Sequence, residues 1–379
     1  MHKVTFYPLC RESGKPPNAE AFRIDLNNSR QVLIDYANMK DATDKSDLRC
    51  DLPKLLKDDL KARDYYDVVI FTHLDDDHVR GAGEFFWFER YPDRQEKGRI
   101  KMRELWVPAA AIVEPGLDGD AELIRAEARH RLRNKAGIRV FSAPDTLGAW
   151  CKNERLDIEE LRELGLIIDA GKIVPGFSLA NDGVEFFVHS PFASRTDDGK
   201  LIERNKDAIV LQAKFILDGG ITRFLIMADV THSEIDEIVR MTRLRERDER
   251  LSWDILDIPH HCSYTGIGPE KGRDVTEATD SVKWLHAQGQ TGGIIVSSSC
   301  IIPSVDTTQP PHRQAAAYYR KVKATINGEF VVTMEEPKKT APEPLVIEIT
   351  GRGAAVKRAA IVTVGGGAVA GTAHRVGLN

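Results

Sequence analysis

The sequence predicts an α/β fold, in which apolar strands alternate with amphipathic helices. Short runs of β-branched and aromatic residues, at 68–71 and 224–227, have the length and composition of buried strands. Each run leads into Asp or His, and polar residues at the carboxyl ends of strands are typical of binding sites in layered α/β proteins. A chain of 379 residues is also long enough to bury a large core.

The composition is that of an ordinary globular protein. Hydrophobic residues make up 42% and charged residues 29%, as in ordinary globular proteins, and the net charge of -5 gives no general attraction to nucleic acid or anionic membranes. The five cysteines are scattered without a Cys-x-x-Cys pair, which argues against a disulfide scaffold or a thiolate zinc site. The N-terminus lacks an apolar signal core, and no apolar run reaches the roughly 20 residues of a membrane helix. We therefore expect a cytoplasmic protein without membrane contact.

The N-terminal part is expected to open as a β-meander. Its strands are predicted at 4–7, 21–26 and 31–36, and a further strand begins at Asp67 after a polar segment of helical character at 40–66. Gly81 and Gly83 allow a tight turn. Next come a predicted helix at 84–91 that buries Phe85, Phe86 and Phe88, a strand at 105–108 and a helix at 120–135.

The remaining elements continue the alternation. Strands are predicted at 184–189, 205–211, 224–229, 255–258, 294–299, 330–333 and 345–349, with helices at 156–164 and from 312 to about 322. A further helix should start at the capping-box pattern formed by Thr231 and Glu234. Residues 351–379 are rich in Gly and Ala and cannot build a core, so they are predicted to be a tail, a linker remnant or a segment that binds a protein partner.

Side chains that bind metal are concentrated directly after the strand at 68–71. They are His73, Asp75, Asp77 and His78. Imidazole and carboxylate are the groups that hold Zn²⁺ and harder divalent ions. In an extended segment His73, Asp75 and Asp77 point to one side, and a turn after Asp77 could bring His78 to a second ion. A run of Asp is usually a solvated loop, but two histidines that bracket it after a buried strand favour a metal site.

The run from His73 to His78 resembles the His-x-His-x-Asp-His signature of the metallo-β-lactamase superfamily, with Asp75 in place of the second histidine. This replacement, followed by Val79-Arg80-Gly81, is similar to the branch that contains the hydrolase domain of bacterial DNA-uptake competence proteins. The resemblance implies a metallo-β-lactamase-like αββα sandwich, with two mixed β-sheets flanked by helices. It implies one domain over residues 1–350, with an insertion-rich helical segment at about 90–180, before the tail.

Three segments depart from the pattern of the family or leave a role open. At His189-Ser190-Pro191, Ala193 occupies a position where many relatives have a metal-binding histidine; the competence branch also lacks this ligand, and we expect His189 to be structural. The segment Asn18-Ala19-Glu20-Ala21 lies where relatives in the competence branch have an Asn/Gln-Gly-Asp-Ala turn, but Ala19 and Glu20 replace Gly and Asp, so we assign it no role. Asp35 ends a strand beside the expected site; an exposed carboxylate is the commoner case, and a partner of a metal ligand is the alternative.

Two further motifs resemble parts of the superfamily site. Asp229 lies between a strand end and a helix start, where the superfamily places a bridging aspartate. Residues 259–263 resemble a Pro-His-His-Gly-Ser motif with Cys262 in place of glycine, and we expect Cys262 to be a buried, unreactive thiol. One of His260 and His261 should bind metal and the other should orient it or contact substrate. The sequence alone does not decide which.

The resemblance implies a cofactor of one or two divalent ions, Zn²⁺ or Mn²⁺. The predicted metal ligands are His73, Asp75, Asp77, His78, Asp229 and His261; the predicted catalytic residues are Asp75, Asp77 and His260; and the predicted substrate contacts are Asn205, Ser263 and Ser298. With fewer histidines than the usual pattern, the first site shifts toward oxygen ligands, which favours Mn²⁺ or Mg²⁺ over Zn²⁺.

The predicted function is that of a metal-dependent hydrolase with a metal-activated water, as a phosphodiesterase or nuclease. A nucleic acid or another phosphodiester is the expected partner. Residues 90–139 hold twelve Lys or Arg against eight acids, which indicates either a solvated helix face or a groove for a polyanion. A hydrolase of a small ester, lactone or amide is the first alternative. A non-catalytic module that binds metal and a partner is the second.

Overall fold

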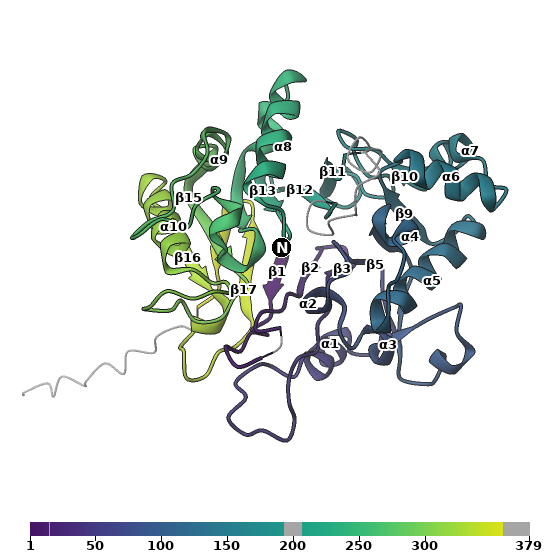
Figure 1. The fold of residues 1–379 in the computed structure, drawn as a ribbon, viewed down its shortest axis with the longest axis horizontal. Helices are drawn as coiled ribbons and strands as arrows, with labels where there is room; N and C mark the ends of the chain where they lie inside the picture. Colours follow the sequence, from purple (N-terminus) through teal and green to yellow (C-terminus); the bar gives the residue numbers. More distant parts are fainter. Residues whose placement is uncertain (15, 193–206, 359–379) are drawn as a thin grey trace, which may run out of the picture.

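Two mixed β-sheets face each other at the centre of the molecule, and helices cover their outer faces (Figure 1). The computed structural model describes residues 1–14, 16–192 and 207–358. Among these residues, one sheet has the strand order β10-β9-β8-β5-β3-β2-β1-β17-β18 and the other β11-β12-β13-β14-β15-β16. A small third sheet has the order β4-β7-β6. The predicted fold class, an αββα sandwich of two mixed sheets, is confirmed.

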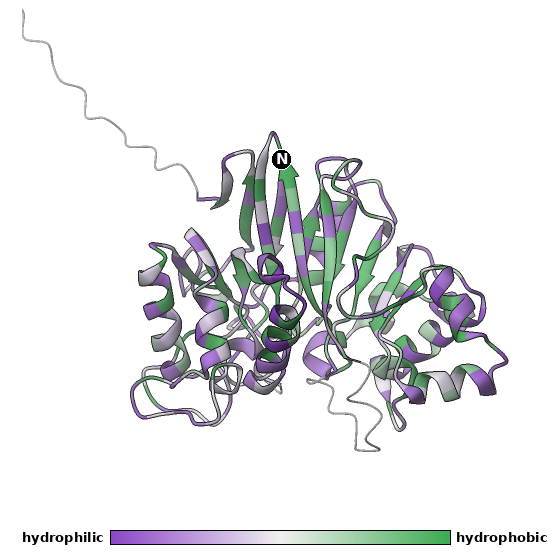
Figure 2. Cartoon of the chain, turned by 90° about the horizontal axis from the view of Figure 1, so that it is seen from above, coloured by the Kyte–Doolittle hydropathy of each residue, from purple (hydrophilic) through white to green (hydrophobic). Residues whose placement is uncertain are grey.

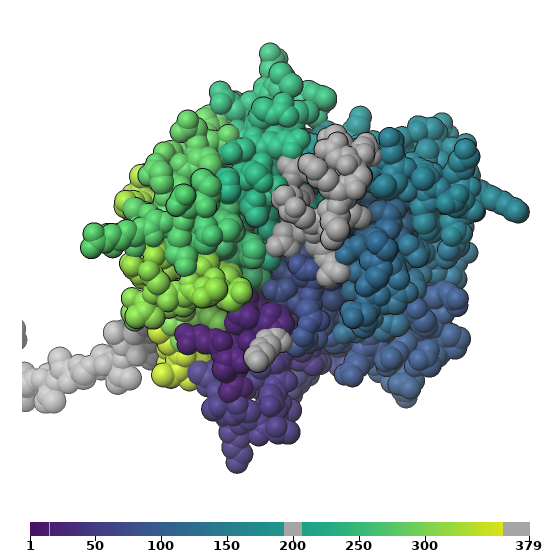
Figure 3. All heavy atoms as spheres, viewed as in Figure 1, coloured from purple at the N-terminus to yellow at the C-terminus, as the bar shows by residue number. Residues whose placement is uncertain are grey.

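The larger sheet joins the two ends of the described chain. Its strands are β1 (His2–Phe6), β2 (Phe22–Asp25), β3 (Gln31–Ile34), β5 (Val68–Ile70), β8 (Leu105–Pro108), β9 (Ile138–Phe141), β10 (Ile167–Ile168), β17 (Leu345–Thr350) and β18 (Gly353–Val356). Neighbours from β3 to β10 are parallel, and the other neighbouring pairs are antiparallel. In Figure 3 the purple N-terminal residues accordingly lie against the yellow C-terminal ones. β18 lies at the start of the predicted tail, so the first residues of that segment belong to the sheet.

The second sheet is built by the C-terminal half. Its strands are β11 (Val184–Ser190), β12 (Val210–Leu217), β13 (Gly220–Ile226), β14 (Trp253–Asp257), β15 (Gly289–Ser297) and β16 (Glu329–Val332). β11, β12 and β13 are antiparallel, and β13 to β16 are parallel. The small sheet consists of β4 (Tyr65–Tyr66), β6 (Phe86–Trp87) and β7 (Ile100–Met102).

The helices fall into two groups, according to the sheet whose strands lie next to them in the sequence. The first group is α1 (Leu52–Leu60), α2 (Asp76–Val79), α3 (Ala82–Phe85), α4 (Ala110–Val113), α5 (Gly119–Arg133), α6 (Asp145–Asn153) and α7 (Ile158–Glu163); the second is α8 (His232–Leu244), α9 (Asp280–His286) and α10 (Arg313–Thr325). Short 3-10 helices also occur, among them His260–Cys262 and Tyr264–Gly266. None of the helices in the described part of the chain has the length and apolar character needed to cross a membrane.

Alternating side chains of the strands explain the layers. In β3, Val32 and Ile34 pack between the two sheets, whereas Leu33 faces the helices of the first group. In β13, Leu225 faces the helices of the second group, and its neighbours pack between the sheets. These parts of β3 and β13 are therefore buried on both faces, as expected for strands covered by helices. Figure 2 shows this pattern as green, apolar strands at the centre and purple, polar segments on the outer helices.

Two predicted elements differ from the structure. Residues 40–50 do not form a helix, because the side chains of Asp41, Asp44 and Asp47 each accept a hydrogen bond from the backbone N–H two residues ahead and so hold the chain in turns. The predicted helix at 84–91 is wrong beyond α3, since Phe86 and Trp87 pair with β7 as β6. Phe85, Phe86 and Phe88 are buried as expected.

Candidate metal centre

Polar side chains from three neighbouring strand ends meet at one edge of the sandwich. His73 and α2 follow β5, Asp229 follows β13, and His260 and His261 follow β14. The carboxyl ends of parallel strands in such folds are where ligands bind. These residues lie far apart in the sequence, and the two sheets bring them together.

The orientation of His73 and His78 is fixed by Asp35, which directly follows β3. Asp35 is 1% exposed and accepts hydrogen bonds from the Thr72 N–H (2.7 Å), the Thr72 hydroxyl (2.6 Å) and Nδ1 of His78 (2.8 Å). Because the Thr72 hydroxyl donates to Asp35, its oxygen is available to accept from Nδ1 of His73, 3.1 Å away. The expectation of an exposed carboxylate at Asp35 is therefore wrong; it is the partner that orients two imidazoles.

His261 is oriented in the same way by a different acceptor. Its Nδ1 donates to the backbone oxygen of Ser298 at 2.8 Å. Each of the buried imidazoles His73, His78 and His261 thus uses its Nδ1–H on an oxygen, which leaves the Nε2 lone pair for another partner. All three Nε2 atoms are buried and have no hydrogen-bond partner. This pattern is typical of histidines that bind a metal ion through Nε2.

The carboxylates of Asp229 and Asp77 complete the cluster. Asp229 is 3% exposed; its Oδ1 lies 3.5 Å from Nε2 of His78, and its Oδ2 lies 3.5 Å from Nε2 of His261. Asp77 Oδ2 lies 3.4 Å from the same nitrogen of His261, and Asp75 Oδ2 lies 3.7 Å from Nε2 of His73. These separations are long for hydrogen bonds.

The separations fit ligands of a shared cation. Two ligand atoms that are each about 2.1 Å from a tetrahedral ion lie about 3.4 Å from one another. The distances above, between 3.4 and 3.7 Å, match that spacing. Unpaired nitrogens in a buried site otherwise cost free energy. The residues present therefore fit a divalent ion.

Burial and neighbouring charges shift the pKa values of the histidines in the cluster. Burial disfavours the charged form of His261, but Asp229 and Asp77 outweigh this and raise its pKa to about 9. Burial and the neighbouring His78 lower the pKa of His73, so this imidazole is neutral at pH 7. A cation that binds here must displace the proton of His261, so binding of metal should release protons.

The adjacent histidines occupy different environments. His261 is 2% exposed, and its Nε2 lies 3.4 Å from Asp77 Oδ2 and 3.5 Å from Asp229 Oδ2. The His260 side chain is 26% exposed, and its Nε2 lies 3.9 Å from Asp229 Oδ2. His261 therefore has the geometry of a ligand, and His260 lies at the open side of the cluster.

We expect the two histidines to differ when each is replaced. His261→Ala should lower metal occupancy, because it removes an imidazole that contacts two other candidate ligands. His260→Ala should retain metal and mainly lower kcat. Metal content and steady-state kinetics of both variants measure this. Equal, small effects of the two changes on both quantities would mean that this turn does not face the metal.

Glu20 is a member of the cluster that the sequence analysis did not assign. Ligand atoms of Glu20, His78, Asp229 and His261 all lie within 4.8 Å of one another, and all four residues are buried. Glu20 comes from the turn before β2, and its N–H donates to the backbone oxygen of Asp77 at 3.0 Å. The available signal was an acid flanked by Ala19 and Ala21, at the position of the aspartate in the resembled turn.

The predicted substrate contacts fall in different places. Asn205 lies outside the described residues, as does Ala193. Ser263 is buried, and its hydroxyl oxygen accepts from the N–H and the hydroxyl of Thr265, so it holds a turn. Ser298 is buried and supports His261 through its backbone oxygen. The hydroxyl of Ser298 itself has no hydrogen-bond partner, and a substrate contact of Ser263 or Ser298 stays a prediction.

Two side chains have the structural character expected of them. Cys262 is fully buried, and burial raises the pKa of its thiol to about 12, so it is unreactive. His189 is 3% exposed and bonds through Nε2 to the backbone oxygen of Arg250 at 2.9 Å, away from the cluster. Burial lowers the pKa of His189 to about 4.

The positive stretch at 90–139 is engaged in contacts within the protein. On α5, Arg125 and Arg129 donate to backbone oxygens that follow or end α4, and Arg133 pairs with Glu154. Other members of the stretch bind carboxylates, as in the pairs Lys101–Asp64, Arg131–Glu127 and Arg139–Glu104. These contacts favour a structural role for the stretch rather than a groove that binds a polyanion.

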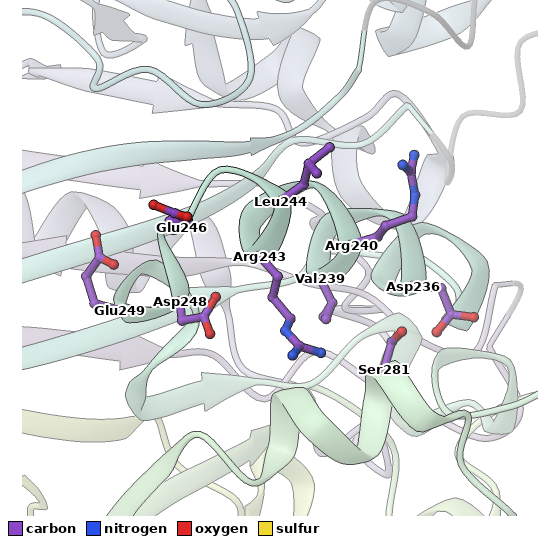
Figure 4. A pocket seen from close by; sticks show the side chains of 9 residues that line it. All are labelled: Asp236, Val239, Arg240, Arg243, Leu244, Glu246, Asp248, Glu249 and Ser281. Atoms are coloured by element: carbon purple, nitrogen blue, oxygen red, sulfur yellow. The ribbon is translucent and has the colours of Figure 1, made fainter.

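One surface hollow of about 880 Å³ lies beside α8, away from the cluster (Figure 4). Arg240 and Arg243 line it together with Glu246, Asp248 and Glu249. No residue of the metal cluster lines this hollow. Charges of both signs on its wall give no preference for an anionic or a cationic ligand.

Comparisons with known protein families and with curated proteins found no match for this chain. Among solved structures, the chain is similar to a long form RNase Z from yeast, with 9% sequence identity and a TM-score of 0.39. The similarity covers 87% of this chain and 40% of the other, so this chain spans well under half of the length of that protein. A similarity this distant assigns neither a family nor a substrate.

Proposed function

We propose that this chain is a metal-dependent hydrolase that acts on phosphodiesters. The observation that carries the proposal is the convergence of the buried, unpaired Nε2 atoms of His78 and His261 on the carboxylate of Asp229, with each imidazole oriented through its Nδ1. The reaction class comes from the resemblance of the His73–His78 run to the hydrolase domain of competence proteins. That resemblance also makes a nucleic acid the first substrate to test.

The candidate ligands form two groups joined by Asp229. His73 and Asp75 would hold one ion, and Asp77, His78 and His261 would hold a second. A divalent ion bound there activates a water molecule as nucleophile near neutral pH and offsets the charge that develops on phosphoryl oxygens. With carboxylates making up half of this ligand set, Mn²⁺ suits the site at least as well as Zn²⁺.

The exposed members of the cluster have the proton-transfer roles. Asp75 is 34% exposed, and His260 is 26% exposed, so both reach the side from which a substrate can enter. Asp75 would accept the proton of the attacking water. His260 would donate a proton to the leaving oxygen or hold a phosphoryl oxygen. The buried members keep their orientation, because Asp35 and Ser298 fix the rings of His78 and His261.

The choice of substrate is tested by two chromogenic compounds. We expect the Mn²⁺- or Zn²⁺-loaded protein to hydrolyse bis-p-nitrophenyl phosphate, and we expect a chelator to stop the reaction. Hydrolysis of p-nitrophenyl acetate but not of the phosphodiester would favour the small ester, lactone or amide hydrolase. Binding of metal without turnover of either compound would favour the non-catalytic module that binds a partner.

A nucleic-acid substrate adds a second readout. Cleavage of DNA or RNA should then depend on salt, with a slope set by the number of phosphate contacts. The net charge of -5 and the paired arginines of α5 provide little general attraction. We therefore expect a shallow salt dependence, in which the bound ions supply much of the attraction to phosphate.

A further inference from the structure

Glu20 reaches the metal cluster from the turn before β2, which lies against α2. Its side chain is 3% exposed, and its Oε1 has no hydrogen-bond partner. The backbone hydrogen bond from Glu20 to Asp77 fixes this turn against α2. A carboxylate oxygen of Glu20 thereby lies within 4.8 Å of candidate ligand atoms of His78, Asp229 and His261.

Asp257 lies behind Glu20, at the end of β14. It is 1% exposed, and both of its Oδ atoms lack a hydrogen-bond partner. Burial and the neighbouring carboxyl group of Glu20 raise the pKa of Asp257 well above its usual range. Adjacent buried carboxyl groups repel one another when both are charged, and an unpaired buried charge is costly. A nearby cation would offset this cost.

We propose that Glu20 is an additional ligand of the metal centre and that Asp257 is the residue that positions it. This inference rests on the proposed function, since it concerns the same centre. It adds a ligand from a turn that lies more than 50 residues before the His73–His78 run. It also gives a function to a buried pair of carboxyl groups that the proposed reaction does not use.

Glu20 would extend the second group of candidate ligands, because it lies with His78, Asp229 and His261. The superfamily signature has a histidine at the position of Asp75, and many relatives have another at the position of Ala193. Glu20 would not replace these nitrogen donors of the first group, but it would add an oxygen donor to the centre. The resulting set is richer in carboxylates, which favours Mn²⁺ over Zn²⁺ further.

The first test replaces Glu20 by glutamine, which keeps its size and removes its charge. Mn²⁺ binding measured by titration calorimetry should weaken by about 10–100-fold, the range seen when groups that support a metal site are lost. The matched control is Glu12→Gln, an exposed acid on the same loop, which should bind like the parent. Glu20→Gln with an affinity within about twofold of the parent would overturn the assignment.

A conservative variant keeps the test independent of folding. Glu20→Asp retains a carboxylate with a shorter reach and restores the acid of the resembled turn. It should bind Mn²⁺ more tightly than Glu20→Gln does. If the two variants bind equally weakly, the carboxylate is not used and the inference fails. Circular dichroism of each variant checks that its fold matches that of the parent.

Asp257 is tested by comparing heat stability with and without Mn²⁺. Asp257→Asn keeps the size of a fully buried side chain and removes its ability to carry a negative charge beside Glu20, so the Tm of the metal-free variant should stay close to that of the metal-free parent. The increase in Tm caused by Mn²⁺ should be smaller in the variant, because less charge favours the ion. A residue that only packs in the core would change the Tm of both states by the same amount. An increase equal to that of the parent would overturn the role of Asp257.

The outcomes separate this inference from the proposed function. A parent protein that binds no divalent ion would contradict the proposed function itself. A parent that binds Mn²⁺ while Glu20→Gln and Asp257→Asn bind it equally well would contradict the inference alone, and the remaining ligands would still form the centre.

Discussion

Asp77→Asn is expected to abolish hydrolysis and leave the protein folded. Asp77 Oδ2 lies 3.4 Å from Nε2 of His261, and its side chain is 19% exposed at the start of α2, so its loss removes a ligand without opening the core. Loss of about 4 kcal/mol of transition-state stabilisation from the metal would lower kcat by about a thousandfold. Steady-state kinetics on a phosphodiester, with circular dichroism for the fold, measures both parts of the prediction.

The neighbouring aspartate provides a matched control. Asp76 precedes Asp77 in the same turn of α2, its side chain is 56% exposed, and it pairs with Arg80. Asp76→Asn removes the same charge from the same turn and should retain activity close to that of the parent. Full activity of Asp77→Asn would remove this residue from the site.

The second large effect is expected from Asp35→Ala. Asp35 accepts three buried hydrogen bonds that orient Thr72 and His78 and, through Thr72, His73. Removing one partner of such a buried pair costs about 3–5 kcal/mol, so the free energy of unfolding should fall by about this amount. Metal affinity should fall by about 10–100-fold, because two imidazoles lose their orientation. Chemical denaturation and metal titration measure the two effects.

The control for Asp35→Ala separates the hydrogen bonds from the backbone. Asp218 also has a left-handed backbone (φ 49°, against 54° for Asp35) and is exposed between β12 and β13. Asp218→Ala should show only the smaller cost of placing alanine at a positive φ. If both variants lost the same stability and bound metal equally well, the hydrogen bonds of Asp35 would have no special role.

The sequence was sufficient to predict the segment with most of the candidate ligands, because those residues are adjacent in the chain. The apolar run of β5 and the adjacent histidines and aspartates lie in one continuous segment, and strand ends are where such residues gather. The strands before Asp229 and His261 were recognised by their composition for the same reason. The resemblance implied that these strand ends meet at one edge of the fold. The arrangement of the two sheets brings them together there.

The sequence alone does not establish the roles of the supporting residues, since these roles depend on contacts across the fold. Asp35 and Glu20 lie far from α2 in the sequence, and only the pairing of β3 with β5 and the turn before β2 bring them to it. Asp257 looks like any strand-end acid until its burial is known. The stability of His78→Ala is a similar case, since this change removes a buried hydrogen-bond partner of Asp35, which only the structure shows.

The two misassigned segments have local causes. In the Asp-rich turns at 41–49, aspartate side chains accept hydrogen bonds from the backbone. A helix predicted from polar composition alone does not take such hydrogen bonds into account. The aromatic run at 85–88 has a composition that suits a helix or a strand, and pairing with β7 decides for the strand at Phe86 and Trp87.

The metal content of the purified protein tests the central claim most directly. After incubation with Mn²⁺ or Zn²⁺ and removal of free ions, elemental analysis should find one or two ions per chain in the parent and fewer in Asp77→Asn. A parent that retains no divalent ion under conditions in which it is folded would contradict the assignment of His73, His78, Asp229 and His261 as a metal centre.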